Sequence, residues 1–326
     1  MHIPFRLLRL LLLLVAIMAG ACAPAVQPPP QANAEESARI KKVFASIDER
    51  NATVKNSEAW LREAYAGIGI LKINDIPADD YARYRPYAVN GEVYIIVHPG
   101  YFPFFDTWDI PRPPADYSRG YPSRNLMERV TADLPKKEVV YRVAREQERI
   151  ARDFIEFMSV EKRLVILVLP RDYKENVTYG AAPGFDEYAR YINELTNRGE
   201  SIVYVESIAH NDGQMTQDDL AVLVRFLQAV NGRTVMLGGG FLGKCLDGFF
   251  GSIRTVMTYE SIYYIPELTA YSPADMVTDR VNLLTESGRL SIRGMRKYFQ
   301  SVAFNRTTGE RLQWKFLPAY QVYQNR

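Results

Sequence analysis

Four short apolar runs set the strongest limit on how this chain can fold. Each is four to six residues long, contains β-branched side chains and lacks the alternation of a half-exposed strand, as is typical of covered parallel sheets. The runs are residues 93–97, 164–169, 202–205 and 234–237. The helical patterns between them are residues 138–158, 185–198 and 216–230. This alternation predicts an α/β fold: a mostly parallel sheet of four or five strands with helices on both faces, residues 262–265 being the fifth candidate strand.

Segments on either side of this α/β core, residues 91–270, are predicted to pack on it. Within 37–90, apolar residues at the spacing of one helix face predict an N-terminal helical segment, with a second short helix beginning at Ser57. Within 271–326 we expect a helix and a hairpin. The helix is predicted to run from Ser272 to about Glu286, because proline follows an N-cap serine there.

The charge balance of the chain bears on its partners. The 326 residues include 40 lysines and arginines and 38 aspartates and glutamates, which gives a net charge of +2. A protein that follows a phosphate backbone needs a basic excess, so the composition argues against nucleic acid as a partner. We also expect no cofactor.

The amino terminus has the pattern of an export signal. Residues 1–9 contain two arginines, residues 10–18 are apolar and uncharged, and Ala19-Gly20-Ala21-Cys22 follows. The apolar run is shorter than the roughly 20 residues that cross a bilayer, whereas a cleaved signal has such a basic start, short apolar run and small residues. A membrane anchor or a buried helix is the alternative reading.

This segment resembles a bacterial lipoprotein signal peptide with its lipobox, although Ala19 stands where the family prefers leucine. The resemblance implies that residues 1–21 are removed and that Cys22 becomes the lipid-modified first residue, which attaches the protein to a membrane. Ala23 is not the aspartate associated with inner-membrane retention. An outer-membrane lipoprotein facing the periplasm or the cell surface is therefore implied, with the proline-rich residues 22–36 as an extended tether.

Reactive side chains follow the predicted strands. Ligands of open α/β sheets bind at the carboxyl ends of the strands, where loops and helix starts converge. The residues at these positions are His98, Arg171, Asp172, Glu206, His210 and Cys245. After removal of the signal, His98 and His210 are the only histidines.

Cys245 is a candidate nucleophile. It follows a glycine-rich turn that includes Gly239 and Gly240, and a helix start and Lys244 beside it would favour a thiolate. His210 would be the base, with Glu206 as a third catalytic group. The alternative for Cys245 is a small buried hydrophobic residue.

A histidine after one strand and a cysteine after the next loosely resembles caspase-like and clostripain-like peptidases. The cysteine at a helix start also resembles isochorismatase-like cysteine hydrolases. The first pattern has a glycine directly after the histidine, whereas Asn211 follows His210 in this chain. The second pattern has an aspartate at the end of the first strand, where this chain has His98-Pro99.

Two other readings of the same residues stay open. Residues 238–243 match the dinucleotide-binding pattern G-x-G-x-x-G, although the strand before them is the fourth and not the first. His98, His210, Glu206 and Asp212 have suitable chemistry for metal ligands but lack a defining spacing.

Residues 99–123 form a long connection rich in aromatic residues and proline, and such loops are usually functional. The rings could stack on a sugar or an apolar peptide, or they could form a hydrophobic cluster over the sheet end. The predicted ligand-binding residues are His98, Tyr101, Trp108, Asp172, Gly239 and Gly240.

Two functions from different classes follow. The first is a lipid-anchored envelope protein that binds a glycan, peptide or protein partner at the carboxyl edge of the sheet. The second is a cysteine-dependent hydrolase that uses Cys245 and His210 at the same edge. Whether the chain is an enzyme is left open by the sequence.

Overall fold

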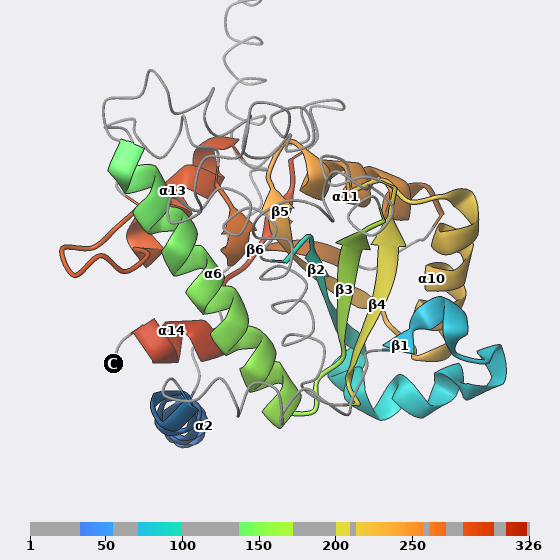
Figure 1. The fold of residues 1–326 in the computed structure, drawn as a ribbon, viewed down its shortest axis with the longest axis horizontal. Coiled ribbons are helices and arrows are strands. Elements are labelled where there is room, and N and C mark those ends of the chain that lie inside the picture. Colours follow the sequence, from blue (N-terminus) through green and yellow to red (C-terminus); the bar gives the residue numbers. More distant parts are fainter. Residues whose placement is uncertain are drawn as a thin grey trace, which may run out of the picture. The chain divides into compact units, whose positions relative to one another are not determined.

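The central element of the protein is a sheet of seven strands in which every neighbouring pair is parallel (Figure 1). The computed structural model describes residues 33–54, 71–99, 137–171, 200–208, 213–256, 261–271, 283–302 and 311–324. The strands are β1 (Leu71–Lys72), β2 (Glu92–Val97), β3 (Val165–Pro170), β4 (Ile202–Ser207), β5 (Thr234–Phe241), β6 (Ser261–Ala270) and β7 (Gln313–Trp314). Their order across the sheet is β1-β4-β3-β2-β5-β6-β7. The predicted α/β class is therefore confirmed.

The number of strands is higher than the predicted four or five. The additional strands β1 and β7 have two residues each, which is too short to leave a periodic pattern in the sequence. Both lie outside the predicted core of residues 91–270 but belong to the same sheet, β1 beside β4 and β7 beside β6.

Helices and 3-10 turns connect and cover the strands. The α-helices among the described residues are α2 (Ala34–Val54), α6 (Lys137–Val160), α10 (Gln217–Ala229), α11 (Cys245–Val256), α13 (Ile292–Val302) and α14 (Pro318–Gln324). The 3-10 helices are η1 (Ile73–Asp75), η2 (Ala78–Tyr87) and η3 (Val89–Gly91). Helix α2 confirms the helical pattern predicted around Phe44, whose ring stacks on Phe157 of α6 with centroids 4.9 Å apart.

The C-terminal segment differs from its prediction in two places. The helix expected to reach Glu286 does not extend there, because Leu284 forms an antiparallel bridge with Leu290 around a turn. In the described part of the expected hairpin, β7 is parallel to β6 and helix α14 follows it. Pro318 explains the helix, because its fixed φ suits the first helical position and cannot continue a strand ladder. The helices predicted at Ser57 and at 185–198 lie outside the described residues.

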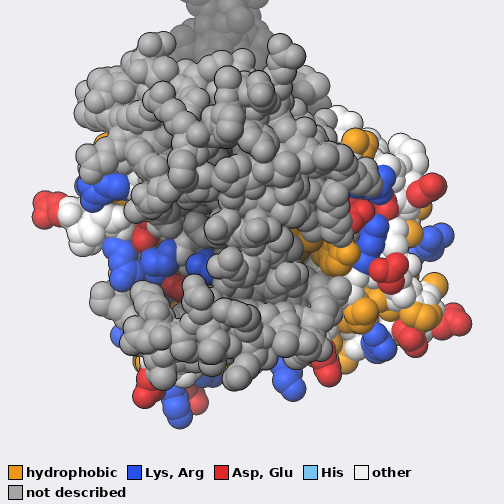
Figure 2. Space-filling view, in the orientation of Figure 1, with side chains coloured by type: hydrophobic (Ala, Val, Ile, Leu, Met, Phe, Trp, Pro, Cys, Tyr) orange, Lys and Arg blue, Asp and Glu red, His pale blue; other side chains and the backbone are white. Residues whose placement is uncertain are grey.

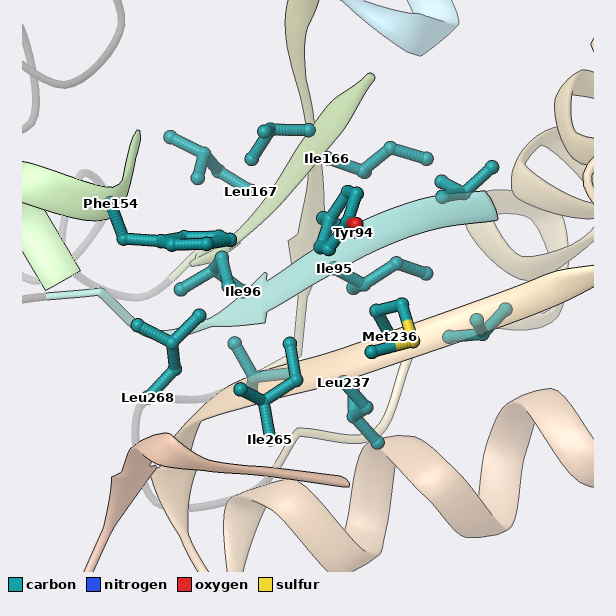
Figure 3. Close-up of a cluster of buried hydrophobic side chains, with 14 of the residues drawn as sticks. Tyr94, Ile95, Ile96, Phe154, Ile166, Leu167, Met236, Leu237, Ile265 and Leu268 are labelled. Carbon is teal, nitrogen blue, oxygen red and sulfur yellow. The ribbon is translucent and has the colours of Figure 1, made fainter. Parts of the chain in front are cut away.

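The two faces of the sheet are covered by different helices, with α6 on one side and α10 and α11 on the other (Figure 1). Strand register assigns side chains to each face, since alternate residues point in opposite directions. Tyr94 is level with Met236 and stacks against Phe154 of α6 at 5.8 Å, whereas Ile95 is level with Leu237 on the opposite face. Figure 3 shows these side chains filling the space on both faces of β2 and β5.

Charged side chains of both signs lie beside one another on the described surface visible in Figure 2. This mixture agrees with the near balance of basic and acidic residues in the whole chain. In the part of the chain that the structure describes, no helix has the length and apolar character needed to cross a bilayer.

Helix α10 begins after a side-chain cap at Thr216, the first residue of the helical pattern predicted over 216–230. Thr216 has an extended backbone, and its hydroxyl accepts the N–H of Asp219 at 3.2 Å, which satisfies one of the unpaired donors of the first turn. The Thr216 hydroxyl also donates to the Asp219 carboxylate at 2.6 Å. This helix start lies beside the end of β4 and fixes the position of the buried Asp219.

Replacing this cap tests its contribution to stability. We expect Thr216→Ala to lower the free energy of unfolding by about 1 kcal/mol, because the Asp219 N–H loses its acceptor. Thr216→Ser keeps the hydroxyl and is expected to retain most of the stability. Urea denaturation followed by circular dichroism measures both variants, and an unchanged alanine variant would contradict the capping role.

Candidate functional site

The carboxyl ends of the parallel strands bring several of the predicted site residues to one edge of the sheet, which we call the rim. The described rim residues are His98, Arg171, Glu206, Ser207, Gly239, Gly240 and Cys245. The other predicted residues lie outside the described part of the chain: Cys22, Tyr101, Trp108, Asp172, His210 and Asp212. Their predicted roles in lipidation, ligand binding and catalysis stay predictions.

His98 contacts a serine that the sequence analysis did not select. The backbone of His98 turns out of β2 with φ 49°, and its N–H donates to the carbonyl of Val168 at 2.9 Å. Its side-chain Nε2 lies 2.7 Å from Oγ of Ser207 at the end of β4. Both residues are buried, with exposed fractions of 5% and 1%. The only sequence signal for Ser207 is its place directly after the run at 202–205, next to Glu206.

Glu206 is held in a network of ion pairs. Its Oε2 lies 2.8 Å from Nζ of Lys72 on β1 and 3.4 Å from Nε of Arg171 after β3. Arg171 also binds Asp219 of α10, with Nη2 at 2.6 Å from Oδ2, and Asn74 donates to the other oxygen of Asp219 at 3.0 Å. Two cations therefore neutralise two buried carboxylates, which is how a protein offsets the cost of burying charge.

This network of ion pairs bears on the catalytic role predicted for Glu206. Burial alone would lower the pKa of Arg171, but the Asp219 and Glu206 carboxylates outweigh burial and raise it. The guanidinium thus stays charged and bridges β3, β4 and α10. Glu206 is bound to these cations, so the described geometry supports a structural role for it.

Cys245 occupies the first position of α11, as the sequence predicts, but its thiol is buried with 5% exposure. Burial raises the pKa of this thiol to about 11, even though the N–H groups of Phe241 and Leu246 and the charge of Lys244 act in the opposite direction. The Phe241 N–H donates to Sγ at 3.2 Å. The helix start and Lys244 therefore favour the thiolate, as the sequence analysis expects, but desolvation outweighs both.

Close packing explains why positions 239 and 240 of the rim are glycine. Gly239 has φ 80°, and a Cβ atom there would lie 2.0 Å from the carbonyl oxygen of Val97 on the neighbouring strand. A Cβ atom on Gly240 would lie 2.8 Å from Sγ of Cys245. The pairing of β5 with β6 also shifts register at Gly239. These contacts explain the glycines without a bound phosphate, and their predicted contact with a ligand stays a prediction.

The rim offers few further groups for chemistry. Among the described residues, no three or more histidine, cysteine, aspartate or glutamate side chains are grouped so that they could hold a metal ion. The two cations of the network are partly exposed, with side-chain exposures of 31% for Arg171 and 21% for Lys72.

Comparisons with known proteins give only distant likeness in structure. No protein-family model and no curated protein matches the sequence. Among solved structures, the chain is similar to a cysteine hydrolase from Pseudomonas syringae pv. phaseolicola 1448A, with 12% sequence identity and a TM-score of 0.32. The match covers 72% of this chain and 91% of that chain. At this TM-score, it supports no conclusion about activity.

The state of Cys245 can be measured directly. With a pKa of about 11, roughly one thiol in ten thousand is ionised at neutral pH, whereas a free cysteine has a pKa of about 8.5. We expect iodoacetamide to modify Cys245 at least about a hundredfold more slowly in the native protein than in urea. The assay uses Cys22→Ser, in which Cys245 is the sole cysteine, with mass spectrometry as the readout. Equal rates in the two conditions would contradict the buried, protonated thiol.

Proposed function

We propose that this chain is an exported lipoprotein, attached to the outer membrane through Cys22, whose α/β domain binds an envelope ligand at the rim. The observation that supports binding over cysteine-dependent hydrolysis is the buried Cys245 thiol, because a nucleophile must reach its substrate and ionise near neutral pH. The export part rests on the sequence of residues 1–22.

The cations of the rim suggest the chemistry of the ligand. Arg171 uses Nε and Nη2 for Glu206 and Asp219, and its Nη1 makes no hydrogen bond to the described residues. A guanidinium fixed by two carboxylates is well suited to a carboxylate or hydroxyl group, since little side-chain entropy is lost on binding. We therefore favour an envelope glycan or peptide that carries a carboxylate.

Binding can be tested with soluble cell-wall fragments that contain sugars and free peptide carboxylates. We expect Arg171→Gln to weaken their binding roughly tenfold or more in calorimetry, because a charge-assisted hydrogen bond contributes about 1.5–3 kcal/mol. Arg225→Gln, an exposed position on α10, makes the same chemical change as a control and should bind like the wild type. Equal binding of both variants would refute the role of Arg171, and failure of the wild type to bind any fragment would refute this ligand class.

Lipidation has its own test. In a Gram-negative host supplied with an alkynyl palmitate analogue, we expect label on the wild type and none on Cys22→Ser, because the Cys22 sulfur takes the diacylglycerol that carries the labelled chains. Cys245→Ser removes the other cysteine of the chain and should keep the label. Label on Cys22→Ser would rule out the proposed anchor.

One observation favours a second candidate function, an acyl hydrolase. The 2.7 Å contact between Nε2 of His98 and Oγ of Ser207 is the geometry of a serine nucleophile with its base. In that reaction, Ser207 Oγ would bond to the acyl carbon as His98 takes its proton. His98 would return the proton to the leaving group, and water would then release the acid from the serine. This candidate replaces the pair of Cys245 and His210 with residues that the structure describes.

A fluorophosphonate probe separates the two functions. The binding proposal predicts no labelling of Ser207 in the native protein, because Ser207 is 1% exposed. Label that disappears in Ser207→Ala and His98→Gln but persists in Cys245→Ala would favour the hydrolase instead.

A further inference from the structure

Strand β6 carries a carboxyl group in the interior that neither proposed function uses. Glu267 has no exposed surface, and its Oε1 accepts the backbone N–H of Leu317 at 2.6 Å. Its other oxygen, Oε2, is buried and has no hydrogen-bond partner in the described part of the chain. No described basic side chain forms an ion pair with it. An ionised carboxylate in such surroundings would be costly, so a proton on Oε2 is the favourable state.

Glu267 interacts electrostatically with three phenols: Tyr94 on β2, Tyr271 after β6 and Tyr320 on α14. The helices that pack against β6 carry further titratable groups, Glu146, Arg149 and Glu156 on α6 and Arg296 and Tyr298 on α13, and Arg289 and Lys315 precede α13 and α14.

These groups do not neutralise a charge on Glu267. Burial raises the pKa of Tyr271 and of Tyr320 well above the ordinary value, and Glu267 raises both further, so the phenols stay neutral. Arg149 pairs with Glu146 at 2.8 Å, and Lys315 lies 3.4 Å from Glu92. Burial raises the pKa of Glu267 itself from 4.5 to about 8, against the two backbone N–H groups that favour the carboxylate.

The hydrogen bond to Leu317 joins the sheet to the C-terminal segment. Leu317 immediately precedes α14, and α14 packs against α2, the first described helix. On its other side, β6 adjoins the glycines of the rim, where a Cβ atom on Gly238 would lie 2.7 Å from Cβ of Leu268. Glu267 therefore lies between the rim and the C-terminal segment.

We propose that Glu267 is a proton-controlled latch: its protonated carboxyl group holds residues 316–324 against the sheet, and loss of the proton weakens that hold. A carboxylate formed there can be hydrated only if the covering residues separate, and the Leu317 N–H is the group of the C-terminal segment that hydrogen-bonds to it. Release of α14 would in turn uncover one side of α2. An exported domain would meet the pH of the medium directly; this use of the latch rests on the proposed function, whereas the latch itself does not.

The direction of the pH effect follows from linkage. While the segment is closed, Glu267 keeps its proton up to about pH 8. Once the segment is open to water, Glu267 has its ordinary pKa of 4.5 and loses the proton above that pH. Between these values the closed form binds more protons, so raising the pH favours opening. Hydrogen exchange of residues 316–324 should thus show protection factors that fall roughly tenfold per pH unit in this window and level off above it.

Variants identify the responsible group. Glu267→Gln cannot ionise, so we expect its protection factors for residues 316–324 to be nearly independent of pH. Glu286→Gln makes the same change at an exposed position and should keep the wild-type slope. A wild-type slope of zero, or the same slope in Glu267→Gln, would overturn the latch.

A spectroscopic measurement on the wild type keeps the test decisive if Glu267→Gln does not fold. Infrared spectroscopy should detect the carbonyl band of a protonated carboxylic acid at about pH 6 and its loss above about pH 9. A band that is absent at about pH 6, or that persists while the segment loses protection, would also overturn the proposal. Neither measurement involves ligand or lipid, so their outcome is independent of the proposed function.

Discussion

The parallel hydrogen-bond ladder that runs through β4, β3, β2 and β5 determines where the described candidate groups of the rim lie. Parallel pairing in register brings the carboxyl ends of all four strands to the same edge. His98, Ser207 and Gly239 are thus neighbours at the rim although more than a hundred residues separate the first from the other two. Antiparallel pairing would have distributed them over two edges.

The sequence predicts the central strands of this ladder well and the short strands at the edges of the sheet poorly. Runs such as 164–169 are apolar on both faces, and each corresponds to a buried strand because helices cover both sides of the sheet. Strands β1 and β7 form because they pair with neighbouring strands, and they leave no signal in the sequence because two residues show no periodicity. The cap at Thr216 was predictable because capping is a local interaction within three residues.

The polar contacts of the rim are harder to predict, because the tertiary fold brings their partners together from different strands and helices. Lys72 and Arg171 lie 134 and 35 residues from Glu206 in the sequence, yet both bind it, and Asp219 joins this ion-pair network from α10. Ser207 is ordinary as a sequence feature and becomes notable only through His98, which reaches it across β3. A list of reactive residue types therefore identifies the edge of the sheet at which these groups meet, but it does not show how they are paired there, as the ion pairs of Glu206 illustrate.

Burial governs the protonation of Cys245 and of Glu267. At Cys245, helix amides and a nearby lysine favour the charged form, and at Glu267 backbone N–H groups do the same, yet each group keeps its proton near neutral pH because desolvation is larger. Local hydrogen bonds can be inferred from sequence position, whereas the depth of burial is a property of the whole fold. This difference explains why Cys245 looked like a nucleophile in the sequence, and why Glu267, in the middle of a strand with no motif around it, did not stand out there.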